Sequence, residues 1–134
     1  MDRTLRLIKL RYLQTFREAN IDITPEQWVL MDTLCKDNGI SQTALANGSF
    51  KNAATVSRII DLLCKKGWTE RQRFENDRRR YKIFLTPTGL AIYNKLLPKV
   101  IALRTLGWQH LSEKDYEDYV RIMNQIFENF GAEE

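Results

Sequence analysis

Hydrophobic residues recur at three- and four-residue intervals along most of this chain, a spacing typical of amphipathic helices. Over residues 4–19 the apolar positions cover more than one side of the predicted helix: Leu5, Leu7, Ile8, Leu10, Tyr12, Leu13 and Phe16. A helix that is apolar on more than one side must bury the excess against a partner. The pattern therefore predicts an N-terminal helix that contacts a second subunit as well as its own core.

A second helix is predicted to begin at Thr24, where a capping threonine is followed by a proline and then by a glutamine at the third helical position. Its buried face is expected to consist of Trp28, Met31, Leu34 and Cys35, and its end is set by Asp37, Asn38 and Gly39. Ser41 then caps a short helix over residues 42–47, which Asn47 and Gly48 should stop or distort.

The helix predicted between Asn52 and Gly67 is the one around which the fold is organised. Asn52 suits the cap of its first turn, and Gly67 suits the left-handed conformation that ends a helix. One side carries an apolar stripe, and the other carries small, polar and charged residues: Ala54, Ser57, Arg58, Asp61 and Lys65. Together with the short helix before it, this segment forms a helix-turn-helix pattern.

Residues 69–74 and 81–85 are rich in strand-forming side chains and flank a polar loop over residues 75–80, so they predict a β-hairpin with a basic tip. Thr86 and Pro87 then start a long helix, which Pro98 should kink or divide. Ser112 and Asp115 resemble the cap of a last helix with a long apolar face: Tyr116, Tyr119, Val120, Met123, Ile126, Phe127 and Phe130. The predicted fold is mainly α with one small hairpin.

Composition and charge favour one integrated unit with a basic surface. The chain has 134 residues, 43% of them hydrophobic, which is enough for a real core. No apolar run is long enough to span a membrane and no signal peptide is present, so we expect a cytoplasmic protein without membrane association. Residues 65–82 hold eight basic and three acidic side chains, whereas residues 111–134 hold two basic and seven acidic ones. The basic cluster follows the helix-turn-helix directly, where it could bind phosphates.

Motifs for catalysis or cofactor binding are missing from the sequence. It contains no phosphate-binding loop, dinucleotide fingerprint, metalloprotease motif or nucleophile elbow. Cys35 and Cys64 are not spaced as metal ligands, and the single His110 gives no catalytic dyad by itself. We therefore expect that the protein is not an enzyme and holds neither a cofactor nor a metal.

Four segments occur in register with the predicted elements: ITPEQWVLMDTL, GISQTALA, ATVSRIIDLLCKKGWTER and NDRRRYKIFLTPTG. They resemble the DNA-binding region of the multiple-antibiotic-resistance regulator (MarR) family of bacterial winged-helix transcription factors. The resemblance implies a winged helix-turn-helix over residues 23–91, flanked by dimerisation helices over residues 1–22 and 92–134. It also implies a homodimeric repressor that binds a palindromic operator in double-stranded DNA and is released by a small aromatic or lipophilic effector.

The N-terminal end of the helix after Asn52 suits the reading of a DNA major groove. Arg58 can contact a guanine edge or a phosphate, Thr55 and Ser57 can donate to either, and small residues let the helix approach. The predicted contacts of this helix are Asn52, Ala53, Ala54, Thr55, Ser57 and Arg58, with Ser41 and Gln42 supporting from the preceding helix. Val56 is expected to anchor the core instead.

The hairpin supplies a second set of predicted DNA contacts: Arg71, Arg73, Asn76, Asp77, Arg78, Arg79 and Arg80. The resemblance implies that Arg79 enters a groove and that Asp77 orients an arginine. An effector crevice could be lined by Tyr12, Phe16 and Trp28, although each of these also fits an ordinary core or interface position.

Two alternatives stay open at the level of the sequence. The winged helix could be a protein-interaction module whose arginines contact an acidic partner, and an arginine run can also be a solvated loop. The regulator could also sense oxidants through Cys35 or Cys64. Against this, we expect Cys35 on an apolar face and Cys64 at a helix C-terminus, whose dipole disfavours the thiolate. Redox-sensing relatives, moreover, carry their reactive cysteine in the first helix, where this chain has none.

Overall fold

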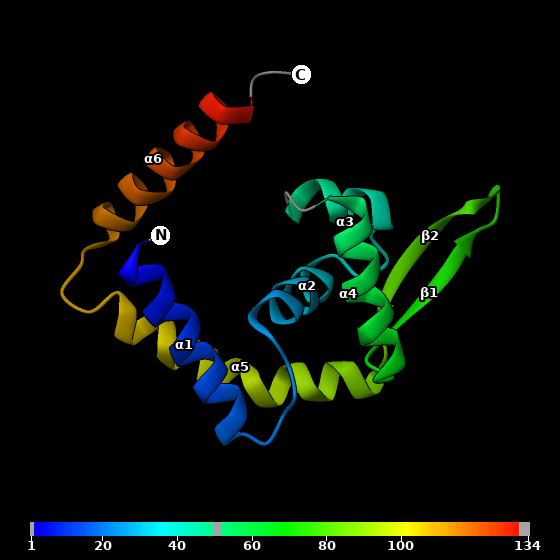
Figure 1. The fold of residues 1–134 in the computed structure, drawn as a ribbon, viewed down its shortest axis with the longest axis horizontal. Helices are drawn as coiled ribbons and strands as arrows, with labels where there is room; N and C mark the ends of the chain where they lie inside the picture. Colours follow the sequence, from blue (N-terminus) through cyan, green and yellow to red (C-terminus); the bar gives the residue numbers. More distant parts are fainter. Residues whose placement is uncertain (1, 50–51, 132–134) are drawn as a thin grey trace. The chain divides into compact units, whose positions relative to one another are not determined.

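The computed structural model describes residues 2–49 and 52–131, which form six helices and one hairpin within those ranges (Figure 1). The elements are α1 Arg3–Glu18, α2 Pro25–Lys36, α3 Gln42–Ser49, α4 Ala53–Lys65, β1 Thr69–Phe74, β2 Asp77–Leu85, α5 Pro87–Gly107 and α6 Glu113–Gly131. The prediction of a mainly helical fold with a small hairpin is confirmed. The chain divides into two compact units, Met1–Val100 and Ile101–Glu134.

Capping residues set the starts of the helices as the sequence predicts. The Thr24 hydroxyl accepts from the Gln27 backbone N–H at 3.1 Å, and the Gln27 side chain accepts from the Thr24 N–H at 3.1 Å, which completes a capping box. The Asn52 side chain accepts from the Thr55 N–H at 2.7 Å at the start of α4. Gly67 follows the end of α4 with a φ of 77°, the left-handed conformation that glycine adopts without strain.

The core of the first unit draws on each of its helices, including α3 through the buried Leu45, and on the hairpin. Its fully buried side chains are Phe16 of α1, Trp28, Leu30, Met31 and Leu34 of α2, Val56, Ile60 and Leu63 of α4, Ile83 of β2, and Leu96 and Val100 of α5. Because the apolar stripe of α4 is buried here, its opposite side is left at the surface.

Three local expectations differ from the structure, and a fourth, for Pro98, is narrowed. Helix α3 runs through Gly48 to Ser49, since one helical glycine costs only about 1 kcal/mol. The tip of the hairpin is the two residues between Phe74 and Asp77, and the remainder of the predicted loop belongs to β2. The sequence predicts that Pro98 kinks or divides its helix, and of these two effects the structure excludes division, because Pro98 lies inside α5 and removes only one backbone donor. Cys35 is exposed, since it lies just outside the buried stripe that ends at Leu34.

Helix α6 in the second unit has no buried residue among those described. Its start matches the prediction, because Ser112 and Asp115 each accept a hydrogen bond from the backbone N–H of the other, at 3.0 and 2.8 Å. Trp108 contacts the rings of Tyr116 and Tyr119 edge-on, at centroid distances of 5.1 and 5.4 Å. None of the described helices is long and apolar enough to cross a membrane.

Gly89 should not tolerate a side chain. A Cβ placed on Gly89 would lie 2.0 Å from the carbonyl oxygen of Trp68, so the start of α5 could no longer approach the segment between α4 and β1. We expect Gly89→Ala to lower the free energy of unfolding by about 3 kcal/mol, the upper range for forced overpacking. Gly107→Ala is the control, since nothing lies within 4 Å of its added Cβ, and it should be neutral or slightly stabilising. Thermal unfolding measures both, and equal melting temperatures would contradict the expectation.

Candidate nucleic-acid interface

Helix α4 presents the residues expected to read DNA on its exposed side. Asn52, Ala53, Ala54 and Arg58 are exposed, and Thr55 and Ser57 are half-buried. Val56 has no exposed surface and belongs to the core, as the sequence predicts. The first turns of α4 thus combine a polar cap and small side chains with a single exposed arginine, and this surface can approach a groove closely.

Helix α3 lies before α4, and the two supporting residues are at its start, Ser41 just before the helix and Gln42 as its first residue. The Ser41 hydroxyl caps α3 by accepting from the Ala44 backbone N–H at 3.0 Å. The backbone of Ser41 also pairs with that of Lys82 in β2, as a single antiparallel β-bridge. The Gln42 side chain accepts a hydrogen bond from Arg71, so it is engaged within the protein. Both supporting residues therefore hold α3 in place beside the hairpin and α4.

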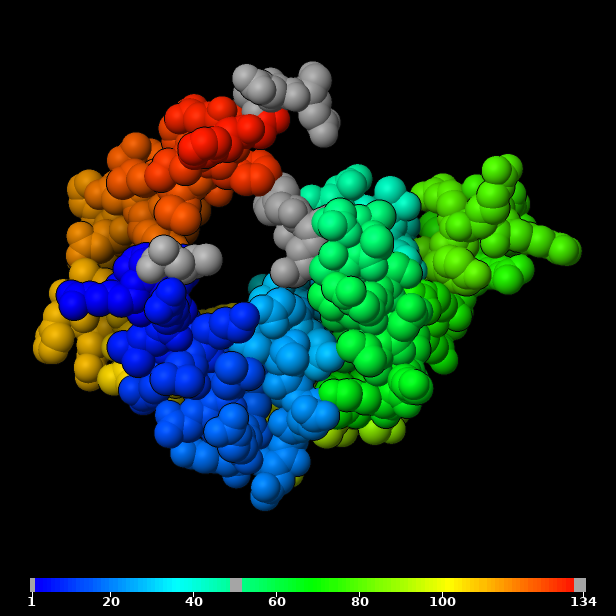
Figure 2. Space-filling view, in the orientation of Figure 1, coloured from blue at the N-terminus to red at the C-terminus, as the bar shows by residue number. Residues whose placement is uncertain are grey.

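The hairpin is anchored at its base and projects from the first unit at its tip (Figure 2). The Gly39 N–H donates to the Ile83 carbonyl at 2.9 Å, and the Ile83 N–H donates to the Ile40 carbonyl at 2.9 Å. The Asn38 side chain accepts from the Leu85 N–H at 2.9 Å. The base of the wing is thereby fixed to the segment between α2 and α3, while the residues that follow the turn stay accessible.

Most of the predicted wing residues lie at the surface of the hairpin. Asn76, Arg73, Arg78, Arg79 and Arg80 are exposed. Arg80 lies over the Phe74 ring at 4.3 Å and Arg73 near the Tyr81 ring at 5.8 Å, contacts that steady long cationic side chains without neutralising them. Among the described residues these arginines make no ion pair, so the wing offers a row of positive charge to a polyanion.

Asp77 acts on the backbone of the wing and not on a guanidinium. Its carboxylate accepts a hydrogen bond from the Arg79 backbone N–H at 2.9 Å, and it makes no ion pair with any residue that the structure describes. The expected pairing with an arginine side chain is thus not seen. The short turn explains this, since Asp77 already begins β2 and faces the amide two residues further on, as aspartate does in Asx-turns.

Arg71 differs from the other wing residues because its guanidinium faces the helices. Nη1 donates to Asp61 Oδ1 at 2.5 Å, Nη2 to the Ser57 carbonyl at 3.1 Å, and Nε to Gln42 Oε1 at 3.0 Å. The side chain is only 21% exposed and lies near the Tyr81 ring, at 5.9 Å. These contacts were missed from the sequence, because they join residues that are far apart along the chain.

A hollow of about 420 Å³ separates the start of α4 from the wing. It is lined by Gln42, Thr43, Ala46 and Asn47 of α3, by Asn52 and Ala53, and by Arg79, Arg80 and Tyr81 of β2. Two arginines and several amide groups therefore border one concave surface, a composition that suits the backbone of a nucleic acid.

The three residues predicted for an effector crevice form a chain of aromatic contacts. Tyr12 lies edge-on to Phe16 at 6.0 Å, Phe16 lies 6.2 Å from Trp28, and Trp28 stacks on Tyr93 at 4.7 Å. Phe16 and Trp28 are buried, and the Trp28 indole N–H has no hydrogen-bond partner among the residues that the structure describes. Burial, together with a hydrogen bond to Asp32 at 2.6 Å and the charge of Asp32, raises the pKa of Tyr93 far above its usual value.

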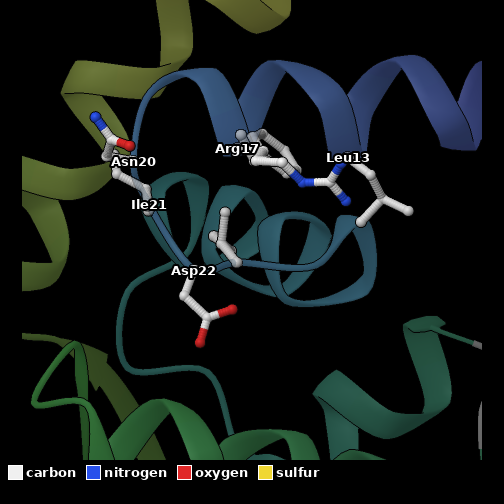
Figure 3. Close-up of a pocket in the computed structure, with 7 residues that line it drawn as sticks. Leu13, Arg17, Asn20, Ile21 and Asp22 are labelled. Atoms are coloured by element: carbon white, nitrogen blue, oxygen red, sulfur yellow. The ribbon is translucent and has the colours of Figure 1, made fainter.

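An open pocket of about 380 Å³ lies at the end of α1 (Figure 3). It is lined by Leu13, Phe16, Arg17, Asn20, Ile21, Asp22 and Ile23, so Phe16 reaches it, whereas Tyr12 and Trp28 do not. The Arg17 side chain runs along α1 toward Leu13, and the Asp22 carboxylate points away from that helix (Figure 3). The pocket thus offers an apolar floor with an arginine at one side.

The two cysteines are free and occupy different settings. Cys35 is exposed near the end of α2. Cys64 is half-buried, and its Sγ lies 3.2 Å from the Thr69 hydroxyl. Among the residues described, no group of histidine, cysteine, aspartate or glutamate side chains could hold a metal ion.

Helices α3 and α4, followed directly by a basic hairpin, define a winged helix-turn-helix, a class of nucleic-acid-binding domain. The family model described as MarR family matches residues 23–81. The transcriptional repressor YetL of Bacillus subtilis is 28% identical over 97 residues, which is 72% of this chain but only 58% of YetL, less than two-thirds of its length. Residues 23–81 are therefore similar to the MarR family, and the curated relatives that the chain matches are transcriptional regulators and not enzymes.

Solved structures share the fold over nearly the whole chain. The Staphylococcus aureus MepR–DNA complex has a TM-score of 0.83 at 22% identity and covers 94% of this chain and 92% of MepR. PcaV of Streptomyces coelicolor, in complex with its natural ligand, has a TM-score of 0.78 at 17% identity and covers 93% and 89%. At these identities the likeness establishes the winged-helix fold alone.

Proposed function

We propose that this protein is a sequence-specific DNA-binding repressor that acts in the cytoplasm as a homodimer on a palindromic operator. The observation that carries the proposal is the joint exposure of the α4 N-terminal residues and the wing arginines around one hollow. In this arrangement α4 enters a major groove and the wing reaches the neighbouring minor groove. The solved MepR complex with DNA supports this use of the fold.

The dimer follows from apolar surface that the single chain leaves exposed. Leu5, Leu7 and Leu10 of α1 are more than half exposed, and α6 buries none of its described residues. A symmetric pair of chains would cover such surfaces and would present two copies of α4 to two half-sites. This arrangement gives the repeated recognition that a palindromic operator requires.

We also propose that a small aromatic or lipophilic effector releases the protein from DNA. Support comes from the pocket beside Phe16 and from the ligand-bound structure of PcaV. A compound that enters this pocket would contact the end of α1 and the segment that leads into α2. The measurement is release from a selected duplex as candidate aromatic acids are added, with Phe16→Ala as the variant that should respond less.

Selection of random duplexes by the purified protein tests the main proposal. We expect enrichment of a palindrome whose half-sites lie about one helical turn apart, since two copies of α4 must reach successive major grooves. On that site, Arg79→Ala should lower the magnitude of the salt slope by about one unit per subunit. Arg17→Ala is the control, because it removes an equal charge near the pocket at α1 and away from the wing. Failure to enrich any sequence, with binding instead to acidic proteins, would overturn the proposal in favour of a protein-interaction module.

A further inference from the structure

Arg58 and Asp61 carry opposite charges on the exposed side of α4. They are three residues apart, a spacing at which an arginine and a carboxylate of one helix can form an ion pair. Such a pair would hold the Arg58 guanidinium against its own helix. It would also cancel part of the charge that Arg58 brings to a nucleic acid.

The structure pairs Asp61 with Arg71 of β1 instead, at 2.5 Å between Nη1 and Oδ1. Within the two described ranges of the chain, Arg58 makes no ion pair. The Asp61 side chain is 62% exposed, so it has room to turn toward Arg58. The ion pair with Arg71 holds the Asp61 carboxylate on the hairpin side instead. Arg71 is less free to move, because Ser57 and Gln42 also accept its hydrogen bonds.

We propose that Arg71 is a positioning residue for DNA recognition, which keeps Asp61 paired with the hairpin so that Arg58 stays available to DNA. The proposal rests on the proposed function, since it requires Arg58 to contact DNA. It replaces the wing contact that the sequence predicts for Arg71. Arginine suits the role because its planar fork of donors reaches α3 and α4 together, which the single ammonium of a lysine cannot do.

Removal of Arg71 changes the charge that DNA meets at α4. The Asp61 carboxylate then pairs with Arg58, which withdraws that guanidinium from DNA and weakens binding. An exposed pair at this spacing is weak and occurs once in each subunit. The expected loss for the dimer is therefore moderate, roughly two- to fivefold in the dissociation constant.

A double-mutant cycle on the selected duplex tests the proposal. Arg71→Ala should weaken binding, and the double variant Arg71→Ala/Asp61→Ala should return to within about twofold of Asp61→Ala. The matched control is Arg71→Ala/Glu70→Ala, which removes an exposed carboxylate from the same strand and changes the net charge equally. Equal recovery in the control would show a general charge effect and would overturn the proposal. No recovery in either double variant would show a purely structural role and would overturn it as well.

The Arg58→Ala background separates this proposal from the proposed function. If Arg71 acts through Arg58, most of the effect of Arg71→Ala should disappear there. An undiminished effect would reject the role of Arg71 while leaving the repressor intact. If the parent protein selects no duplex, or Arg58→Ala leaves binding on the selected duplex unchanged, it is the proposed DNA-reading function that fails.

Arg71→Lys is the second variant, for the case in which Arg71→Ala does not fold. Thermal unfolding shows whether each variant is folded. Lysine retains the charge opposite Asp61 but gives up most of the hydrogen bonds to Ser57 and Gln42. Affinity close to that of the parent is expected, because the carboxylate stays neutralised. A folded Arg71→Lys protein whose binding falls tenfold or more, and does not recover when Asp61→Ala is added, would overturn the proposal.

Discussion

Glutamate at both Met123 and Ile126 should convert the proposed dimer into monomers and abolish tight DNA binding. The two side chains are 47% and 44% exposed in the single chain, on a helix that buries no described residue. Burial of a methionine or isoleucine contributes about 1.5–3 kcal/mol, and a two-fold interface holds each position twice. We therefore expect the dimer dissociation constant to rise by roughly a thousandfold or more.

The loss of DNA affinity should follow from the loss of the second half-site. Two linked recognition surfaces bind roughly 10²–10⁴-fold more tightly than one, so the monomer should lose at least about a hundredfold on the palindrome. The control is Gln125→Glu/Asn129→Glu, which adds the same charge on the polar side of α6. Light scattering at micromolar protein concentration measures the oligomeric state, and titration of the duplex measures the DNA affinity. A glutamate variant that remains a dimer would exclude this face of α6 as the interface. A parent protein that is already a monomer would remove the two-half-site mechanism.

The helix starts could be predicted from the sequence because a cap involves only neighbouring residues. Thr24 and Gln27, or Asn52 and Thr55, satisfy one another within a single turn, so the residue types suffice to place the boundary. The same holds for the long apolar stripe of α4, whose period alone identifies the buried side.

The errors arise where a local signal competes with the rest of the fold. Gly48 is typical of a helix end, but a glycine inside a helix lowers the stability of that helix only slightly. The contacts of α3 with the rest of the fold outweigh this loss, and the helix continues to Ser49. Asp77 reads as part of a polar loop, yet register with β1 places it in a strand. Cys35 follows Leu34, the last buried residue of α2, and is exposed. The apolar pattern alone could not show whether a residue at the border of the buried side is buried or exposed.

The candidate site shows the same division between local and distant information. The exposed residues of α4 follow from its period, so Arg58 was placed correctly at the surface. Arg71 looked like one more wing arginine, because its partners Asp61 and Gln42 lie on other elements, 10 and 29 residues away. Sequence composition describes the charge of a hairpin, but only the register of strand and helices shows which of its arginines are engaged within the protein.

Arg58→Ala should cause the largest loss of affinity of any single substitution on the side of α4 that we propose faces DNA. Arg58 is exposed near the beginning of α4 and makes no ion pair within the described residues. A bidentate contact between an arginine and a guanine edge contributes about 1–3 kcal/mol of discrimination, and a dimer makes it twice. The expected loss on the selected palindrome is therefore about 2–6 kcal/mol, with preference relaxed at one position in each half-site.

Two further variants separate base reading from simple charge. Lys65→Ala removes the same charge from the far end of α4, about 10 Å along the helix axis, and should weaken binding slightly and equally on all duplexes. Arg58→Lys keeps the charge but cannot form the bidentate pair, so it should lose most of the preference for the guanine while retaining non-specific affinity. Titrations against the palindrome and against duplexes altered at one position per half-site measure these differences. An equal loss for Arg58→Ala on every duplex would identify Arg58 as a phosphate contact and would leave sequence reading to Thr55, Ser57 and the wing.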